Sequence, residues 1–155
     1  MLSFYRSQHD NQSWLAALTA MLDTSALVAI GVEGTCQRQA RLTFAMARHT
    51  VVDLAQVLGR PPLDDTDRLF PDELARLRAS LAAAGVGLHV GAGADEKLAE
   101  MRRMYEPYVA ALSRHLIMPL PPWRAGAASR ENWRTTAWGN RGPGPRGGVD
   151  PHEDD

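Results

Sequence analysis

Apolar residues recur at steps of three and four positions between Asn11 and Val32. This spacing predicts an α-helix with one core-facing stripe. Gly31 and Gly34 follow the last periodic position, where glycine commonly ends a helix. The stripe consists of Trp14, Leu15, Leu18, Met21, Leu22, Ala26 and Ile30.

A second helix is expected from Thr35 to Leu58, and its apolar residues form two adjoining stripes. A helix that is apolar over so much of its surface usually lies in the centre of a bundle, so we expect this helix to be central. One stripe contains Leu42 and Met46 with His49, and the other contains Phe44, Ala47, Val51, Leu54 and Leu58.

Two shorter patterns predict further helices. One begins with Pro71 in its first turn and is closed by Gly85. The other runs from Asp95, which can cap it, to Ile117 and contains Pro107. A proline inside a helix removes a backbone donor and crowds the preceding turn, so we expect a kink between residues 103 and 107.

No segment shows the sustained alternation that is typical of strands, so the expected class is all-α, a bundle of about four helices. We assign this bundle to residues 1–122. Residues 123–155 are dense in Pro, Gly and Arg without apolar periodicity, which predicts a partly disordered tail. Its order would come at most from Trp123, Trp133 and Trp138 docking on the bundle.

Composition excludes several classes. The chain has 17 basic and 18 acidic residues, so it lacks the basic excess that general binding to nucleic acid requires. Cys36 is the only cysteine, which excludes an intramolecular disulfide and a cysteine metal cluster and fits a reducing compartment. The N-terminus does not have the pattern of a secretory signal, so we expect a cytoplasmic protein.

The stretch from Trp14 to Val32 is close to the length of about 20 residues that spans a membrane. Asp23 lies at its middle, however, with Thr19, Thr24 and Ser25 nearby. A charge at that depth is costly in lipid, which favours a buried helix of a soluble protein.

Polar residues cluster before the first helix at His9, Asp10, Asn11 and Ser13. Neighbouring residues point to different faces of any regular element, and no second His or Cys stands at ligand spacing, which argues against zinc. Asp10, Asn11 or Ser13 can instead accept the free backbone N–H groups at a helix start. We therefore interpret this cluster as capping, and we expect neither a metal nor a cofactor.

His49 and Asp53 are four residues apart and therefore share one helical face, where a carboxylate could fix the histidine tautomer. No nucleophile motif accompanies them, so we favour a structural role over catalysis. A buried Asp23 requires a partner because desolvation costs several kcal/mol per ion. We expect Arg41 or Arg48 to pair with Asp23, which would complete a polar network with His49 and Asp53.

The segment "GVGLHVGAG" lacks both the third glycine of a dinucleotide fingerprint and the Gly-Lys-Ser/Thr ending of a phosphate loop, so we interpret it as a flexible linker. Tyr105 and Tyr108 stand near Arg102, Arg103 and Arg114, where they could bind an anion. Aromatic stripes at helical spacing are more often core, and we expect these arginines to pair with Glu100 and Glu106.

Four blocks of the chain are long and distinctive: "YRSQHDNQSWLAALTAMLDTSALV" (5–28), "QARLTFAMARHTVVDLAQV" (39–57), "MRRMYEPYVAALSRHLIMPLPPW" (101–123) and "ENWRTTAW" (131–138). Together they resemble the C-terminal cytoplasmic helical region of bacterial two-pore-domain-type potassium channel family proteins. The family carries membrane helices and a selectivity filter upstream of this region, and this chain contains neither. A filter needs carbonyls from several subunits between such helices, so we expect no conduction by the chain alone.

The resemblance implies a non-catalytic assembly or regulatory module, like a detached cytosolic portion of a channel. Its expected partners are further copies of itself or the membrane domain of a channel, with no nucleic acid and only indirect contact with the membrane. Two alternatives stay open: a small enzyme that uses His49 and Asp53, and a helical nucleic-acid adaptor that uses the tail arginines.

Overall fold

The structure is a computed structural model that describes residues 13–32, 37–64, 66–89 and 91–124. Within these ranges the chain is helical and contains no strand, which confirms the all-α prediction. The helices are α1 (Trp14–Gly31), α2 (Gln37–Val57), α3 (Pro71–Ala83), α4 (Ala92–Arg103) and α5 (Glu106–Leu116). Contacts divide the chain into residues 1–124 and 125–155, and the second unit, with Trp133, Trp138 and the tail arginines other than Arg124, lies outside the described residues.

The helix predicted from Asp95 to Ile117 is two helices, so the described residues contain five helices where about four were expected. The chain breaks at Met104 and Tyr105, inside the segment where a kink was expected. Tyr105 leaves the helical conformation with φ −133° and ψ −31° and is fully buried. Pro107 then lies in the first turn of α5, where no intrahelical donor is required.

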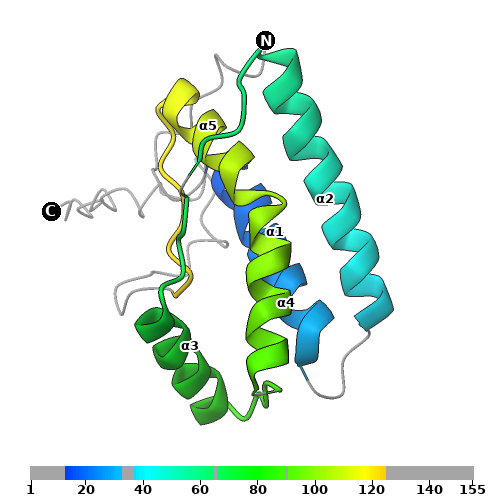
Figure 1. The fold of residues 1–155 in the computed structure, drawn as a ribbon, viewed down its shortest axis with the longest axis vertical. Coiled ribbons are helices and arrows are strands. Elements are labelled where there is room, and N and C mark those ends of the chain that lie inside the picture. Colours follow the sequence, from blue (N-terminus) through cyan, green and yellow to red (C-terminus); the bar gives the residue numbers. More distant parts are fainter. Residues whose placement is uncertain (1–12, 33–36, 65, 90, 125–155) are drawn as a thin grey trace, which may run out of the picture. The chain divides into compact units, whose positions relative to one another are not determined.

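The central helix is α1, and the prediction that α2 is central was wrong. α1 contacts α2, α4 and α5, whereas α2 packs against α1 and α5. In Figure 1, α2 runs antiparallel to α1, and α4 crosses in front of α1. α1 can be central because its apolar and small residues surround the helix, so it offers a packing surface on several sides.

The core gathers side chains from all five helices. Phe44 of α2 meets Tyr105 edge-on, with ring centroids 5.9 Å apart and planes at 78°. This edge-to-face arrangement is one that aromatic pairs prefer. The most buried core residues are Leu15, Leu22, Ala26, Val51, Ala55, Tyr105, Val109 and Leu112.

The segment after α3 is fixed to the end of α1. The backbone N–H of His89 donates to the Gly31 carbonyl at 2.9 Å, and Val32 and Leu88 form an isolated antiparallel bridge. The glycine-rich stretch predicted to be a flexible linker is thus anchored through its described residues 88 and 89. Gly31 permits this approach, since a Cβ there would lie 2.7 Å from Cδ2 of His89.

α1 has the length and composition of a membrane-spanning helix, with a mean hydropathy of 1.5 over 18 residues. Half of this segment, 50%, is buried within the protein. Core helices of soluble proteins have the same properties, so this feature alone does not place the chain in a membrane.

We predict that Gly31→Ala destabilises the fold by about 2 kcal/mol, because the new methyl group overlaps the His89 side chain. The control is Gly93→Ala in α4, where an added Cβ meets nothing within 4 Å. That change should stabilise by about 0.5 kcal/mol, since alanine loses less backbone entropy in a helix. Urea unfolding followed by circular dichroism measures both, and equal effects would contradict the close packing at Gly31.

Candidate functional site

Asp23, in the middle of α1, is buried and has two partners. Arg68, in the extended segment between α2 and α3, donates from Nη1 to Oδ1 at 3.1 Å and from Nη2 to Oδ2 at 2.8 Å. The Tyr105 hydroxyl donates to Oδ1 at 2.5 Å. The carboxylate therefore receives three donors, which compensates for much of its lost hydration.

The expected partners of Asp23 were wrong. Arg48 donates from Nε to the Met104 carbonyl at 3.3 Å, and Arg41 lies exposed on α2. Arg68 occupies the position because the segment that follows α2 turns back along α1. A guanidinium in this extended segment reaches Asp23 with both of its Nη atoms.

A second set of contacts surrounds Arg102 at the end of α4. Arg102 donates from Nε and Nη2 to the two oxygens of Glu106, each at 3.1 Å, which confirms the expected pairing of an arginine with Glu106. It also donates to the Leu69 carbonyl at 3.1 Å and to the Asp67 carboxylate. Arg102 and Glu106 are four residues apart and stay in contact although they belong to different helices, α4 and α5.

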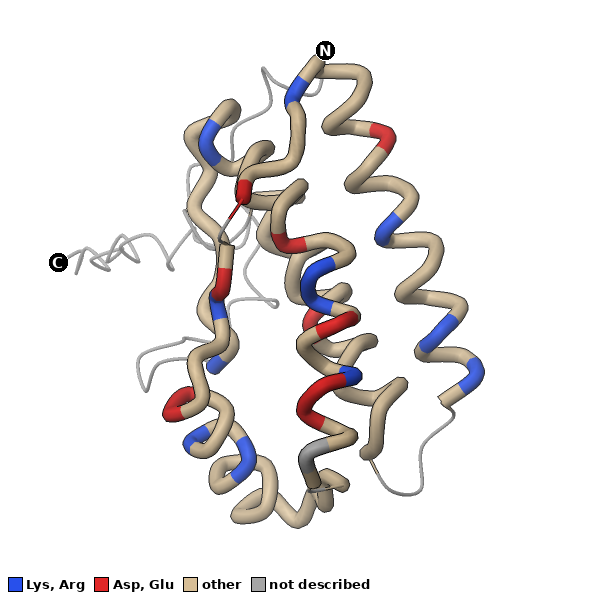
Figure 2. The backbone as a smooth tube through the Cα atoms, in the orientation of Figure 1, with Lys and Arg blue, Asp and Glu red and all other residues tan. Residues whose placement is uncertain are grey.

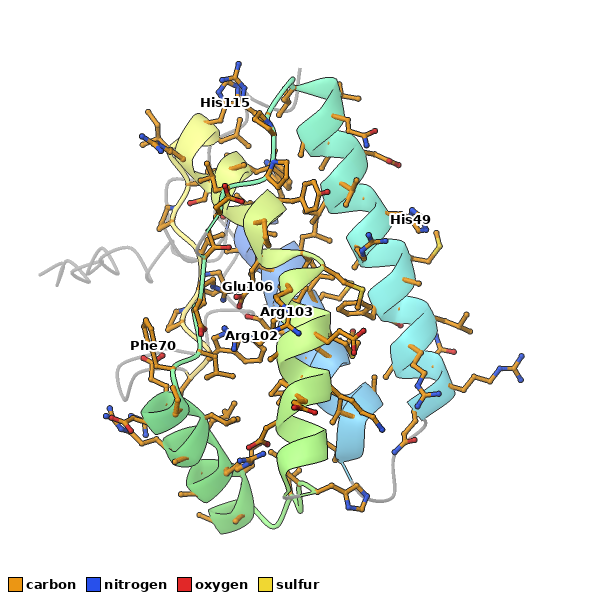
Figure 3. The ribbon with its side chains drawn as sticks, viewed as in Figure 1. His49, Phe70, Arg102, Arg103, Glu106 and His115 are labelled. Carbon is orange, nitrogen blue, oxygen red and sulfur yellow. The ribbon has the colours of Figure 1, made fainter. Side chains whose placement is uncertain are left out.

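The two sets join into one charge network, which we define as Asp23, Asp67, Arg68, Arg102, Tyr105 and Glu106. Nη1 of Arg68 lies 3.9 Å from Oε1 of Glu106. The Trp123 ring lies 5.8 Å from the Arg68 guanidinium and 5.7 Å from that of Arg102, a cation–π distance in both cases. Figure 3 shows Arg102 and Glu106 directed toward the extended segments.

The network holds the C-terminal end of the described chain. Arg68 donates from Nη2 to the Pro121 carbonyl at 2.8 Å, and Met118 is buried in the core. Trp123 is one of the three tryptophans through which the tail could be ordered, and it packs against both arginines. In Figure 1 the segment after α5 runs beside the segment that leads to α3.

Burial and pairing shift the pKa values in the network. Burial, followed by the neighbouring Asp23 charge, raises the pKa of Tyr105 far above its ordinary value, so the phenol stays a neutral donor. Burial also raises the pKa of Glu106, and the opposing effect of Arg102 and Arg68 is smaller. Burial lowers the pKa of Arg102, but its hydrogen bonds to Glu106 and Asp67 outweigh this and raise it overall.

The Asp67 carboxylate shifts in the opposite direction from Glu106. Burial alone would raise its pKa, but the hydrogen bond from Arg102 and that from the Leu69 N–H outweigh burial and lower it. Asp67 is therefore an ion at neutral pH, and it shares Arg102 with Glu106. The network thus contains three carboxyl groups and two guanidinium groups. Hydrogen bonds and ion pairs connect each of them to at least one other member.

A hollow of about 530 Å³ adjoins the network between the segment after α2 and the α4–α5 junction. Three of its lining residues, Asp67, Arg102 and Glu106, are already bonded to one another. Thr66 also lines it and has a buried hydroxyl without a hydrogen-bond partner among the described residues. Internal pairing thus occupies these three charged groups, whereas Asp64 and Arg103 also line the hollow and do not belong to the network.

The remaining predicted network residues lie elsewhere. Arg41, His49 and Asp53 are all exposed on α2, so the predicted polar network of the core was wrong for them. Their helical positions place them away from Phe44 and Val51, which face the core. Figure 3 shows His49 pointing outward from α2.

The helix-start cluster is described only at Ser13. Its hydroxyl accepts the Ala16 N–H at 3.0 Å and caps α1, which confirms the predicted capping role for this residue. His9, Asp10 and Asn11 lie outside the described residues. Among the described residues no group of three His, Cys, Asp or Glu side chains is arranged to hold a metal ion.

Sequence reasoning missed Asp67, Arg68 and the double contact of Trp123. The first two belong to "LDDTDRLF", which has no helical period and was interpreted as an acidic loop. The sequence contains one signal, the apolar pair Leu69 and Phe70 directly after Arg68, and the structure buries Leu69.

Comparisons of the chain with protein-family models, with curated proteins and with solved structures find no match.

We predict that Asp23→Ala destabilises the protein by about 3 kcal/mol, because the mostly buried Arg68 loses both of its hydrogen bonds to this carboxylate and the Tyr105 hydroxyl loses its acceptor. Glu96→Ala is the control, which removes an exposed carboxylate of α4 outside the network, and it should change stability by less than about 0.5 kcal/mol. Chemical denaturation of both variants measures the contrast. An unchanged unfolding midpoint for Asp23→Ala would refute the network's structural role.

The raised pKa of Glu106 predicts a pH dependence that Glu106→Gln removes. The stability that goes with protonated Glu106 is fully present below its ordinary value of 4.5 and is lost as the pH rises through the folded-state pKa. Glutamine stays neutral, so the free energy of unfolding of the variant should rise relative to wild type between pH 4 and 7. Urea titrations across this range test it, and a difference that does not vary with pH would contradict the shift.

Proposed function

We propose that this chain is a non-catalytic cytosolic module for assembly or regulation, and that the outer face of α2 is its contact surface. The observation that carries the proposal is the second apolar stripe of α2. Leu42 is 54% exposed and Met46 is 69% exposed, although both belong to a helix whose other face is buried in the core. At about 100° per residue, each lies about 160° around the helix from Phe44.

This arrangement supports a two-sided role for α2. One stripe packs on α1 and α5, and the opposite one, which we call the outer stripe, contains Arg38, Leu42, Ala45, Met46, His49 and Asp53, all of them exposed. Apolar side chains at helical spacing on a solvent-facing surface are typical of sites that bind another protein. The channel connection is supported by the resemblance of the four sequence blocks, which implies partners that are further copies or the membrane domain of a channel.

The position of the ionisable groups favours this role over catalysis. His49 and Asp53, the pair that an enzyme would use, project from α2 into solvent. The buried carboxylate of Asp23 accepts three hydrogen bonds, and its residue is 6% exposed, so little of it can reach a substrate. Asp53→Asn should therefore leave both the free energy of unfolding and the helical structure of α2 unchanged.

Crosslinking in cells tests the proposal. We expect a photo-crosslinking amino acid at position 42 or 46 to give a discrete adduct, because the outer stripe is covered in the working assembly. The same amino acid at Ser80, which is exposed on α3, is the control and should give none. Mass spectrometry of the adduct shows whether the neighbour is this chain or a membrane protein, and the absence of any adduct at both positions would contradict the proposal.

A further inference from the structure

The charges on the outer stripe have a polarity along the helix. Arg38 lies near the N-terminal end of α2 and Asp53 near its C-terminal end, with the apolar residues between them. Figure 2 shows basic positions of α2 from its start to its middle and an acidic position toward its end. Among the described residues neither Arg38 nor Asp53 has an ion pair or a side-chain hydrogen bond, so both charges are free for a partner.

These positions have a symmetry that one partner would satisfy. Arg38 and Asp53 lie equally far from the midpoint between Ala45 and Met46, and so do Leu42 and His49. When two identical helices pack antiparallel around a two-fold axis, residues at equal distances on either side of that axis face each other. An axis at this midpoint therefore brings Arg38 of one copy to Asp53 of the other, twice, in a single register.

We propose that the occupant of the outer stripe is a second copy of this chain, packed antiparallel along α2 with the two-fold axis between Ala45 and Met46. Leu42 of each copy lies against the imidazole of the other copy's His49. Ala45 of each copy faces Met46 of the other copy beside the axis, where the small alanine leaves room for the longer methionine side chain. The two Arg38–Asp53 pairs close the ends of the contact and set its register.

This inference rests on the proposed function and names the partner of that surface. A parallel arrangement would instead place Arg38 beside Arg38 and Asp53 beside Asp53, where like charges oppose association. In the antiparallel arrangement the dipoles of the two helices also point in opposite directions, which is favourable. Charge therefore selects both the direction and the register of the pairing.

The test is charge reversal with sedimentation velocity on the full chain across a concentration series. Wild type should form a reversible dimer. Arg38→Asp or Asp53→Arg alone should weaken it about tenfold, because each creates two like-charge contacts. The double variant should recover wild-type affinity, and an equimolar mixture of the two single variants should form a heterodimer, since both pairs are then complementary.

Two features keep the result interpretable. Both substituted residues are exposed, and each reversal places a charge that the helix dipole favours at that end, so the variants should fold. Arg76→Asp, an equally exposed reversal on α3, is the matched control and should leave association unchanged.

Two outcomes would overturn the inference: a wild-type chain that stays monomeric at every concentration, or single reversals that the double variant fails to rescue. The proposed function is judged separately. A monomeric chain that still gives an adduct with another protein at position 46 in cells would reject the second copy as the partner and leave the contact surface standing. If the purified chain forms a dimer whose affinity responds to these reversals but positions 42 and 46 give no adduct in cells, the dimer in solution is supported and the proposed function is contradicted.

Discussion

The carboxylate of Asp23 at the middle of an apolar helix constrains the rest of this fold. An isolated buried ion costs several kcal/mol, so α1 can be central only if a cation and further donors reach Asp23. Arg68 and Tyr105 supply them, and neither belongs to the helix that packs most extensively on α1. The extended segment before α3 and the break between α4 and α5 are therefore part of what makes α1 a core helix.

The same constraint explains how segments without secondary structure become ordered. Arg68 bonds the carboxylate of α1 and the Pro121 carbonyl, and it shares the Trp123 ring with Arg102. One guanidinium thus joins three parts of the chain that are distant in sequence. Such pairing contributes more to a unique arrangement than to net stability, because desolvation offsets much of the attraction.

The helices and the need for a buried partner could be predicted from sequence, but the partner could not. Apolar spacing is local and indicates where α1, α2 and α3 lie, and a charge inside an apolar run marks Asp23. Spacing also shows that His49 and Asp53 share a face, but it does not say which face of a two-striped helix meets the core. Arg68 lies in a segment without any period, so only the three-dimensional path of the chain brings it to Asp23.

The pairing of the ionisable groups within the network has a consequence for where function can reside. The Tyr105 hydroxyl keeps its proton and donates it in a hydrogen bond to Asp23. Arg102 donates to two carboxylates and to one carbonyl. A group that reacts or binds must have a lone pair, a proton or a surface that is not already committed. In α2, whose inner stripe is buried, that uncommitted surface is the outer one, where apolar side chains and two unpaired charges of opposite sign meet solvent. α2 carries a second apolar stripe opposite its core face. The free energy of the protein is lower when another helix covers this stripe than when water does.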